Sequence, residues 1–177
     1  MGGITLRELL REEISRVWDI DRGEVIENVY HLVNGTLVLR PQYEEMIGWP
    51  YGEAKKYTPI LLDCFDSAGW FYGVFDEGLL VGAAILEGRF IGSRNDRLQL
   101  KFLHVSRSYR GQGLGAKLFE LAKATARERG ARWLYISATP SENTINFYMR
   151  LGCTIASEPD PELFLLEPED IHLDLEI

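Results

Sequence analysis

The sequence is poor in the residues that crosslink small domains or hold metal ions. Its two cysteines, Cys64 and Cys153, lie far apart in apolar surroundings, so we expect buried, reduced thiols rather than a disulfide. Its three histidines show no spacing with each other or with cysteine that a metal site requires. We therefore expect no metal ion.

Long apolar runs are also missing. No run approaches the roughly 20 residues that a membrane-spanning helix needs. The first segment, "MGGITLRELLREE", turns charged at once and lacks the apolar stretch of a signal peptide. These absences favour a cytoplasmic protein with no membrane partner.

Positive charge is scarce. The sequence has 19 Lys and Arg residues and 27 Asp and Glu residues, which gives a net charge of -8. The phosphates of a nucleic acid would be repelled, so we expect no nucleic-acid partner. Carboxylate-lined clefts concentrate cations, which favours a cationic small molecule, although an acidic surface also serves solubility alone.

The chain has 177 residues, of which 46% are hydrophobic, enough for one good core and a single domain. In its first part, "TLRELLREEISRVW" predicts a helix after a Thr5 cap. Asn34 and Gly35 predict a hairpin turn. "GEAKKYTPILLDCFDSAG" reads as partly helical, with Pro59 breaking or opening the helix and Gly69 closing it.

The second part has a clearer pattern. It predicts a hairpin at Glu77 and Gly78, a strand "RLQLKFLHV", a helix that stops at Gly130, a strand "RWLYISAT" and a helix from Ser141 to Gly152. "ELFLLEPEDIHLDLEI" predicts one or two closing strands. This order indicates a mostly antiparallel sheet. A single crossover, from a strand through a helix to the next strand, makes one parallel pair.

The loop "RGQGLG", Arg110–Gly115, lies at the start of the long helix. Helix N-termini carry unpaired N–H groups and partial positive charge, and glycines let an anion approach those groups. A single glycine would favour a packing turn, but this cluster predicts a phosphate-binding loop.

Other phosphate motifs fit less well. Gly111, Gly113 and Ala116 match G-x-G-x-x-A, but "SRSYR" separates them from the strand, and the next strand ends in 137–139 without an acidic residue. A P-loop needs Lys and then Ser or Thr directly after its last glycine, whereas Lys117 follows Ala116.

The segment from "LHVSRSYRGQGLG" to "NFYMRLGC" resembles the acyl-CoA-binding core of the GNAT superfamily of N-acetyltransferases. The family signature is Arg or Gln, two residues, Gly, one residue, then Gly or Ala, and it is met by Arg110, Gly113 and Gly115. The resemblance covers about 70–153. It implies an α+β, three-layer fold whose mixed, mostly antiparallel sheet is splayed at the central parallel pair, with helices on both faces.

The resemblance also implies one N-acetyltransferase domain over 1–177, with a variable acceptor-side region in 1–69 and an acetyl-CoA-binding core in 70–177. In the family, loop amides hold the pyrophosphate of coenzyme A, a role that falls on Arg110, Gly111, Gln112, Gly113, Leu114 and Gly115. Arg110 would add a charge-assisted contact. The preceding strand offers backbone groups to the pantetheine arm and the thioester carbonyl, a role for Leu103 and Val105. Ser141 and Asn143 match polar cofactor-binding positions less closely, and helix capping explains them equally well.

The resemblance makes Tyr148 the general acid that protonates the leaving thiolate, although a tyrosine that packs helix on sheet would look the same. The general base is not indicated. Gln99 and Lys101 occupy the family's base positions but do not suit the role, and His104 should face the other side of the strand from Leu103 and Val105. The remaining candidates are a chain of waters or Glu24, Glu27 and Glu53.

The acceptor should be recognised by the N-terminal third, where Trp49 and Tyr51 form either an aromatic wall for a cation or an ordinary surface loop. The first hypothesis is acetyl transfer from acetyl-CoA to a primary amine of a small molecule, by direct attack through a tetrahedral intermediate. The alternatives are acetylation of a protein N-terminus or lysine, and a coenzyme A-binding regulatory module without turnover. A homodimer is suggested by analogy only.

Overall fold

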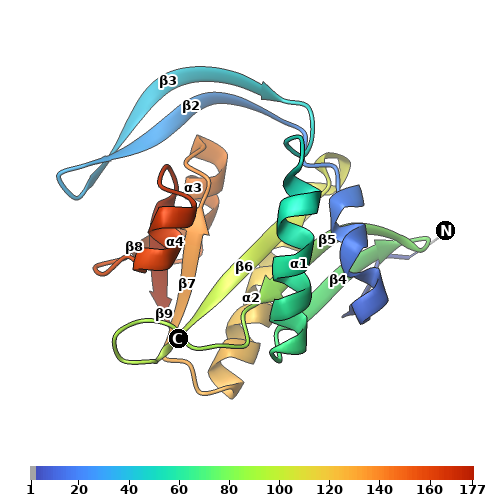
Figure 1. Ribbon diagram of the computed structural model, residues 1–177. Helices are drawn as coiled ribbons and strands as arrows, with labels where there is room; N and C mark the ends of the chain where they lie inside the picture. The colour runs from blue at the N-terminus through green and yellow to red at the C-terminus, as the bar shows by residue number, and fades with distance from the viewer. Residues whose placement is uncertain (1–2) are drawn as a thin grey trace.

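The computed structural model describes residues 3–177 and contains a seven-stranded sheet with helices on both faces (Figure 1). Its strands, in spatial order, are β1 (Thr5–Glu8), β4 (Trp70–Asp76), β5 (Leu79–Leu86), β6 (Arg97–Val105), β7 (Trp133–Ala138), β9 (Ile171–Glu176) and β8 (Thr154–Ile155). The helices are η1 (Arg11–Asp19), α1 (Glu53–Asp66), η2 (Arg107–Tyr109), α2 (Leu114–Glu128), α3 (Glu142–Arg150) and α4 (Pro161–Leu166). No helix within residues 3–177 is long and apolar enough to cross a membrane.

The sheet divides at its centre. β6 and β7 run parallel and pair only over Arg97–Gln99 and Trp133–Tyr135. Beyond this point β6 stays paired with β5, while β7 continues along β9 as far as Ala138. The expected splay at a central parallel pair is therefore confirmed, and the gap that it opens is the framework of the site.

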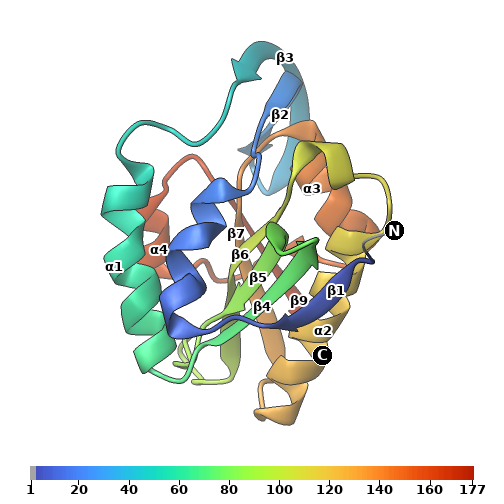
Figure 2. The same ribbon diagram turned by 90° about the vertical axis from the view of Figure 1, so that its right-hand side faces the viewer.

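A separate hydrophobic core lies on each face of the sheet. On one face α2 and α3 contribute Leu118, Phe119 and Ile145 to the larger core, and on the other η1 and α1 contribute residues such as Ile14 and Leu61. Figure 2 shows the two layers of helices on either side of the strands. Burial of each large apolar side chain stabilises the fold by about 1.5–3 kcal/mol, which makes the splayed sheet a firm support.

A β-bulge in β6 changes the direction of its side chains next to the gap. Ile85 pairs with Phe102 and Leu86 with Leu100, so Lys101 is an extra residue without a partner on β5. Leu100 therefore packs in the core under α2, whereas Phe102, two residues later, packs in the opposite core.

The strands β2 (Glu24–Val33) and β3 (Thr36–Met46) form a two-stranded ribbon that arches over the other elements (Figure 1). The expected turn is confirmed, since Asn34 and Gly35 have φ of 50° and 77°. The ribbon is fastened to the start of α3 by the Tyr30 N–H, which donates to the Pro140 carbonyl at 2.8 Å. It therefore covers the end of the gap near α3.

Two sequence predictions about the elements are wrong, and a third is right only in part. The helix expected after Thr5 is instead strand β1, because Thr5–Glu8 extend the sheet beside β4, and the helix that begins at Arg11 is a 3₁₀ helix. Pro59 lies inside a continuous α1, where packing of that helix on the core outweighs one lost hydrogen bond. The closing segment forms one strand, β9, as expected, but its first residues, "ELFLL", lie in helix α4, whose first amides are capped by the Asp160 side chain.

Candidate active site

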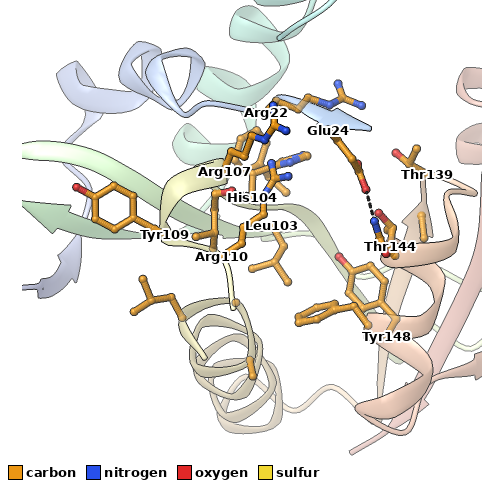
Figure 3. A pocket seen from close by; sticks show the side chains of 18 of the residues that line it. Arg22, Glu24, Leu103, His104, Arg107, Tyr109, Arg110, Thr139, Thr144 and Tyr148 are labelled. Carbon is orange, nitrogen blue, oxygen red and sulfur yellow. Dashed lines mark hydrogen bonds between the residues drawn. The ribbon is translucent and has the colours of Figure 1, made fainter. Parts of the chain in front are cut away.

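The first cavity, of about 790 Å³, fills the gap where β6 and β7 separate (Figure 3). Its walls come from β6, the end of β7, the glycine loop, the first turn of α2, one side of α3 and the segment before β2. The lining residues are Arg22–Val25, Met46, Leu100–Val105, Arg107, Tyr109–Gly111, Gly113–Ala116, Ser137–Thr139, Asn143, Thr144, Phe147, Tyr148 and Arg150.

The glycine loop presents bare backbone to this cavity. Gly111 and Gly113 have φ of 76° and 81°, which L side chains rarely adopt, and a Cβ at either position would meet nothing within 4 Å. Gly113 is the N-cap of α2, and no side chain caps that helix. The amides of the first turn are therefore free to bind an anion, with the helix dipole behind them. At Gly115 a Cβ would lie 3.4 Å from the Phe147 ring, in ordinary van der Waals contact.

Arg110 holds the loop in place. Its guanidinium donates to the carbonyl oxygens of Val105 at 2.8 Å, Gly23 at 2.9 Å and Asp21 at 3.3 Å. These bonds tie the loop to the end of β6 and to the segment before β2, so the side chain is committed to the protein backbone. The other cations at the cavity wall are Arg22, Lys101, Arg107 and Arg150, of which the sequence analysis missed the three arginines.

Leu103 and Val105 turn backbone groups toward the gap. The Ser106 N–H donates to the Val81 carbonyl of β5. Because successive residues of a strand point their backbone groups to opposite sides, those of Leu103 and Val105 point away from β5. The bond from Arg110 to the Val105 carbonyl agrees with this direction.

Tyr148 projects from α3 into the same cavity (Figure 3). The residue is only 6% exposed, and its ring packs beside Phe147 and Phe119. Burial, with smaller contributions from Cys153 and from the charge of Asp170, raises the pKa of its hydroxyl above the usual value near 10. The phenol is therefore protonated at neutral pH and able to donate a proton.

Of the remaining predicted cofactor-binding residues, one lines the first cavity and two do not. Asn143 lines the cavity, and its amide donates to Glu24 Oε1 at 3.2 Å, the bond dashed in Figure 3. Ser141 is buried away from the cavity, and its hydroxyl caps α3 by accepting the Thr144 N–H. Gln112 is exposed and is not among the lining residues either. The capping alternative thus explains Ser141.

A second cavity, of about 630 Å³, adjoins the first at the splay. It is bounded by the segment that leads into α1, by α1 itself, and by the end of α4 with the loop to β9. The residues that line both cavities are Arg22, Lys101, Phe102, His104, Ser137 and Thr139. A molecule in one cavity can therefore meet a molecule in the other where β6 and β7 part.

Aromatic rings line the second cavity. Trp49 stacks on Phe102 with ring centroids 5.7 Å apart, and its indole N–H donates to the Ile20 carbonyl at 2.9 Å. The cation over its ring is the protein's own Arg22, whose guanidinium carbon lies 5.0 Å from the ring centroid. Tyr51 is fully exposed at the rim.

Carboxylates form the other part of this wall. Glu53 pairs with Arg22 at 3.2 Å, Glu167 accepts a hydrogen bond from the Tyr57 hydroxyl, and Asp170 accepts one from Ser137 Oγ at 2.8 Å. Glu24 lines the first cavity, and the exposed Glu27 lines neither. Asp170 and Ser137 were missed because 33 positions separate them and no short motif joins them.

Of the two strand positions that the family uses for a base, Gln99 is neutral and Lys101 is held in an ion pair. Lys101 Nζ lies 3.1 Å from Glu87 Oε2 and donates to the Gln99 side chain. His104 packs against Trp49 and Phe102, and burial together with Arg22 and Arg110 lowers its pKa to about 3. Its imidazole is therefore neutral and a very weak base.

The model of the Acetyltransferase (GNAT) family matches residues 29–153, a stretch that includes β6, the glycine loop and Tyr148. The chain belongs to this family. The protein is thus a GNAT acetyltransferase, as the resemblance of the glycine-loop segment indicated. No curated protein matches the acetyltransferase significantly in sequence.

Solved structures share the fold of this acetyltransferase along nearly its whole length. Nourseothricin acetyltransferase matches with a TM-score of 0.74 and 20% identity, over 98% of each chain. A protein assigned as a streptothricin acetyltransferase from Bacillus anthracis, solved with acetyl coenzyme A, matches with a TM-score of 0.64 and 16% identity, over 99% of this chain and 98% of that one. PaiA N-acetyltransferase from Thermoplasma acidophilum, solved with coenzyme A, matches with a TM-score of 0.65 and 14% identity, over 99% of each chain.

Proposed function

We propose that this acetyltransferase moves the acetyl group of acetyl-CoA to a primary amine of a small, cationic molecule. The observation that carries the proposal is the meeting of two different cavities at the splay of β6 and β7. The first has free helix amides and arginines. The second has aromatic rings and the carboxylates of Glu53, Glu167, Glu169 and Asp170, beside the cations Arg22, Lys56 and Lys101.

The first cavity suits acetyl-CoA. Its pyrophosphate would be held by the amides of Gly111, Gly113 and the first turn of α2, with Arg107 and Arg150 adding positive charge nearby. Backbone groups of Leu103 and the N–H of Val105 point to the side where the pantetheine arm would lie, whereas the Val105 carbonyl accepts a hydrogen bond from Arg110. When bound, acetyl-CoA supplies an acetyl group activated as a thioester.

The second cavity suits an amine that arrives as a cation. Glu167, Glu169 and Asp170 line one end of it, and their negative charge concentrates ammonium groups. Its volume of about 630 Å³ fits a small molecule. Nourseothricin and streptothricin acetyltransferases are named for small-molecule substrates, and similar folds in those proteins add support to this choice.

Tyr148 is the proton donor in this proposal. Its hydroxyl projects into the first cavity and is kept protonated by burial. The phenol can therefore give its proton to the sulfur of the leaving thiolate, which becomes the thiol of coenzyme A.

The test is an acceptor screen in which thiol release is followed with acetyl-CoA and a panel of putrescine, spermidine, L-lysine, streptothricin and a peptide with a free N-terminus and lysine. We expect one or more of the small amines to be acetylated, with the product confirmed by mass spectrometry. Acetylation of the peptide alone would mean a protein substrate. Binding of acetyl-CoA without transfer to any member would favour a regulatory module.

A further inference from the structure

The loop between α4 and β9 places one carboxylate directly at the splay. Asp170 is the residue before β9 and is half-buried. It accepts a hydrogen bond from Ser137 Oγ at 2.8 Å. Ser137 belongs to β7 and lines both cavities, whereas Asp170 lines only the second. The carboxylate therefore faces the acceptor side where the two cavities meet.

The other acidic candidates are committed elsewhere. Glu53 is paired with Arg22, and Glu24 lines only the first cavity, away from the acceptor side. The side-chain hydrogen bond to Asp170 comes from a neutral hydroxyl, which leaves the carboxylate available to a substrate ammonium. A carboxylate is needed here, because an alkylamine with a pKa near 10.4 reaches the site protonated and cannot attack until it loses a proton.

The titratable and charged groups that face Asp170 come from several elements. They are Arg22, Glu53, Lys56, Tyr57, His104, Tyr148, and Glu167 and Glu169 of its own segment. Lys101, also in the wall, is paired with Glu87. Burial raises the pKa of Asp170, Glu167 adds to this and Arg22 opposes it. A carboxyl whose pKa is raised toward neutrality is a stronger base than an exposed aspartate.

We propose that Asp170 is the general base of the reaction, that it accepts a proton from the substrate ammonium, and that Ser137 orients it. This inference rests on the proposed function. Asp170 would touch the substrate nitrogen and is a catalytic residue in this sense, while Ser137 acts through Asp170 as a positioning residue.

The proposed step balances. The Asp170 carboxylate takes one proton from the ammonium, and the freed lone pair forms the C–N bond at the thioester carbonyl carbon. The C–S bond breaks with its electron pair on sulfur, which takes the Tyr148 proton, and the tyrosinate recovers a proton from the nitrogen through solvent. Asp170 then releases its proton to water. The sum is ammonium plus acetyl thioester giving amide, thiol and one proton.

The test compares Asp170→Asn with wild type over pH 6 to 9.5, using the small amine that wild type acetylates fastest in the acceptor panel. Asp19→Asn, an exposed carboxylate that lines neither cavity, is the matched control. Without the base the enzyme depends on free amine, roughly one molecule in 10³ at pH 7.4 for a pKa near 10.4. We expect kcat/KM of D170N to be about 10²-fold or more below wild type at pH 7.4 and to recover most of this loss by pH 9.5.

His104 and Tyr148 do not titrate in this range, because the pKa of His104 is about 3 and that of Tyr148 is raised above its usual value.

A ratio of the kcat/KM of D170N to that of wild type that stays constant with pH, at an unchanged Tm, would overturn the inference while leaving the proposed function intact. Should D170N melt well below wild type, Asp170→Glu is the reporter. It keeps a carboxylate, so its kcat/KM should depend on pH as that of wild type does, at a lower kcat. A kcat/KM of D170E that instead rises with the fraction of free amine would also overturn the inference. Absence of transfer by wild type to every small amine would instead defeat the proposed function itself.

Discussion

The guanidinium of Arg110 and the carbonyl oxygen of Gly23 form a hydrogen bond of 2.9 Å across 87 positions of sequence. The same guanidinium reaches Val105 and Asp21, so one side chain joins the glycine loop, the end of β6 and the N-terminal wall of the first cavity. The shape of the proposed acetyl-CoA site therefore depends on a contact that no local motif contains.

Replacement of Arg110 by lysine tests this connection. One ammonium cannot reproduce the planar set of donors that spans the three carbonyls. We expect R110K to raise the Kd for acetyl-CoA about tenfold and to lower the free energy of unfolding by about 1 kcal/mol. Calorimetry and urea unfolding measure both. Arg129→Lys is the control, because Arg129 donates to the single carbonyl of Ala68 at the far end of α2. Equal effects of the two substitutions would contradict the role of Arg110.

Gly113→Ala tests the bare backbone of the loop. At φ of 81° an alanine costs about 1–2 kcal/mol in backbone strain, although no neighbour lies within 4 Å of its Cβ. Gly130→Ala is a matched control at the other end of α2, with φ of 88° and equally open surroundings. Both variants should lose similar stability, but only G113A should bind acetyl-CoA more weakly, by tenfold or more. Unchanged binding by G113A would mean that the loop does not hold the pyrophosphate.

Tyr148→Phe removes the proposed proton donor and keeps the ring that packs against Phe147 and Phe119. Loss of a general acid lowers turnover by about 10²-fold or more. We expect kcat to fall by this amount, with the Kd for acetyl-CoA within about twofold of wild type. Steady-state kinetics and calorimetry separate the two effects. Wild-type kcat in Y148F would reduce the tyrosine to a packing residue.

The stability of the fold at low pH should depend on Glu13. Its carboxylate accepts two bonds from Arg7, at 2.7 and 2.8 Å, and one from the Leu10 N–H. The Arg7 bond first, then the Leu10 bond, lowers the pKa of Glu13 to about 2. Because the pKa is lower in the folded protein, the stabilisation is complete above the unfolded value and disappears as pH falls toward 2.

Urea unfolding of wild type and Glu13→Gln at pH 7, 4 and 2.5 measures this dependence. The variant should be less stable at pH 7, and the difference should narrow steadily as the solution becomes more acidic. A difference that does not change with pH would contradict the ionic origin of the stabilisation.

Features with a strong local cause were predictable from the sequence. Asn34 and Gly35 specify their turn through their own backbone preferences, and "RLQLKFLHV" specifies β6 through its strand composition. The glycine loop was predictable in the same way, because its positive φ angles and its place before a helix are both written in adjacent residues.

Features that depend on distant contacts were not predictable. Leu6, Leu9 and Leu10 have helical spacing, yet pairing of Thr5–Glu8 with β4 draws the first of them into a strand. The bulge at Lys101, which turns Phe102 and His104 toward the second cavity, depends on the register with β5. The meeting of Asp170 with Ser137 similarly requires β7 and β9 to be neighbours.

The most direct test of the proposed acetyl-CoA site is a calorimetric titration of the protein with acetyl-CoA, with NAD and ATP as comparison ligands. We expect micromolar binding of acetyl-CoA and much weaker binding of the other two, because NAD and ATP have no pantetheine arm to lie along β6 in the gap between β6 and β7. Absence of acetyl-CoA binding, or a clear preference for NAD or ATP, would contradict the proposed site.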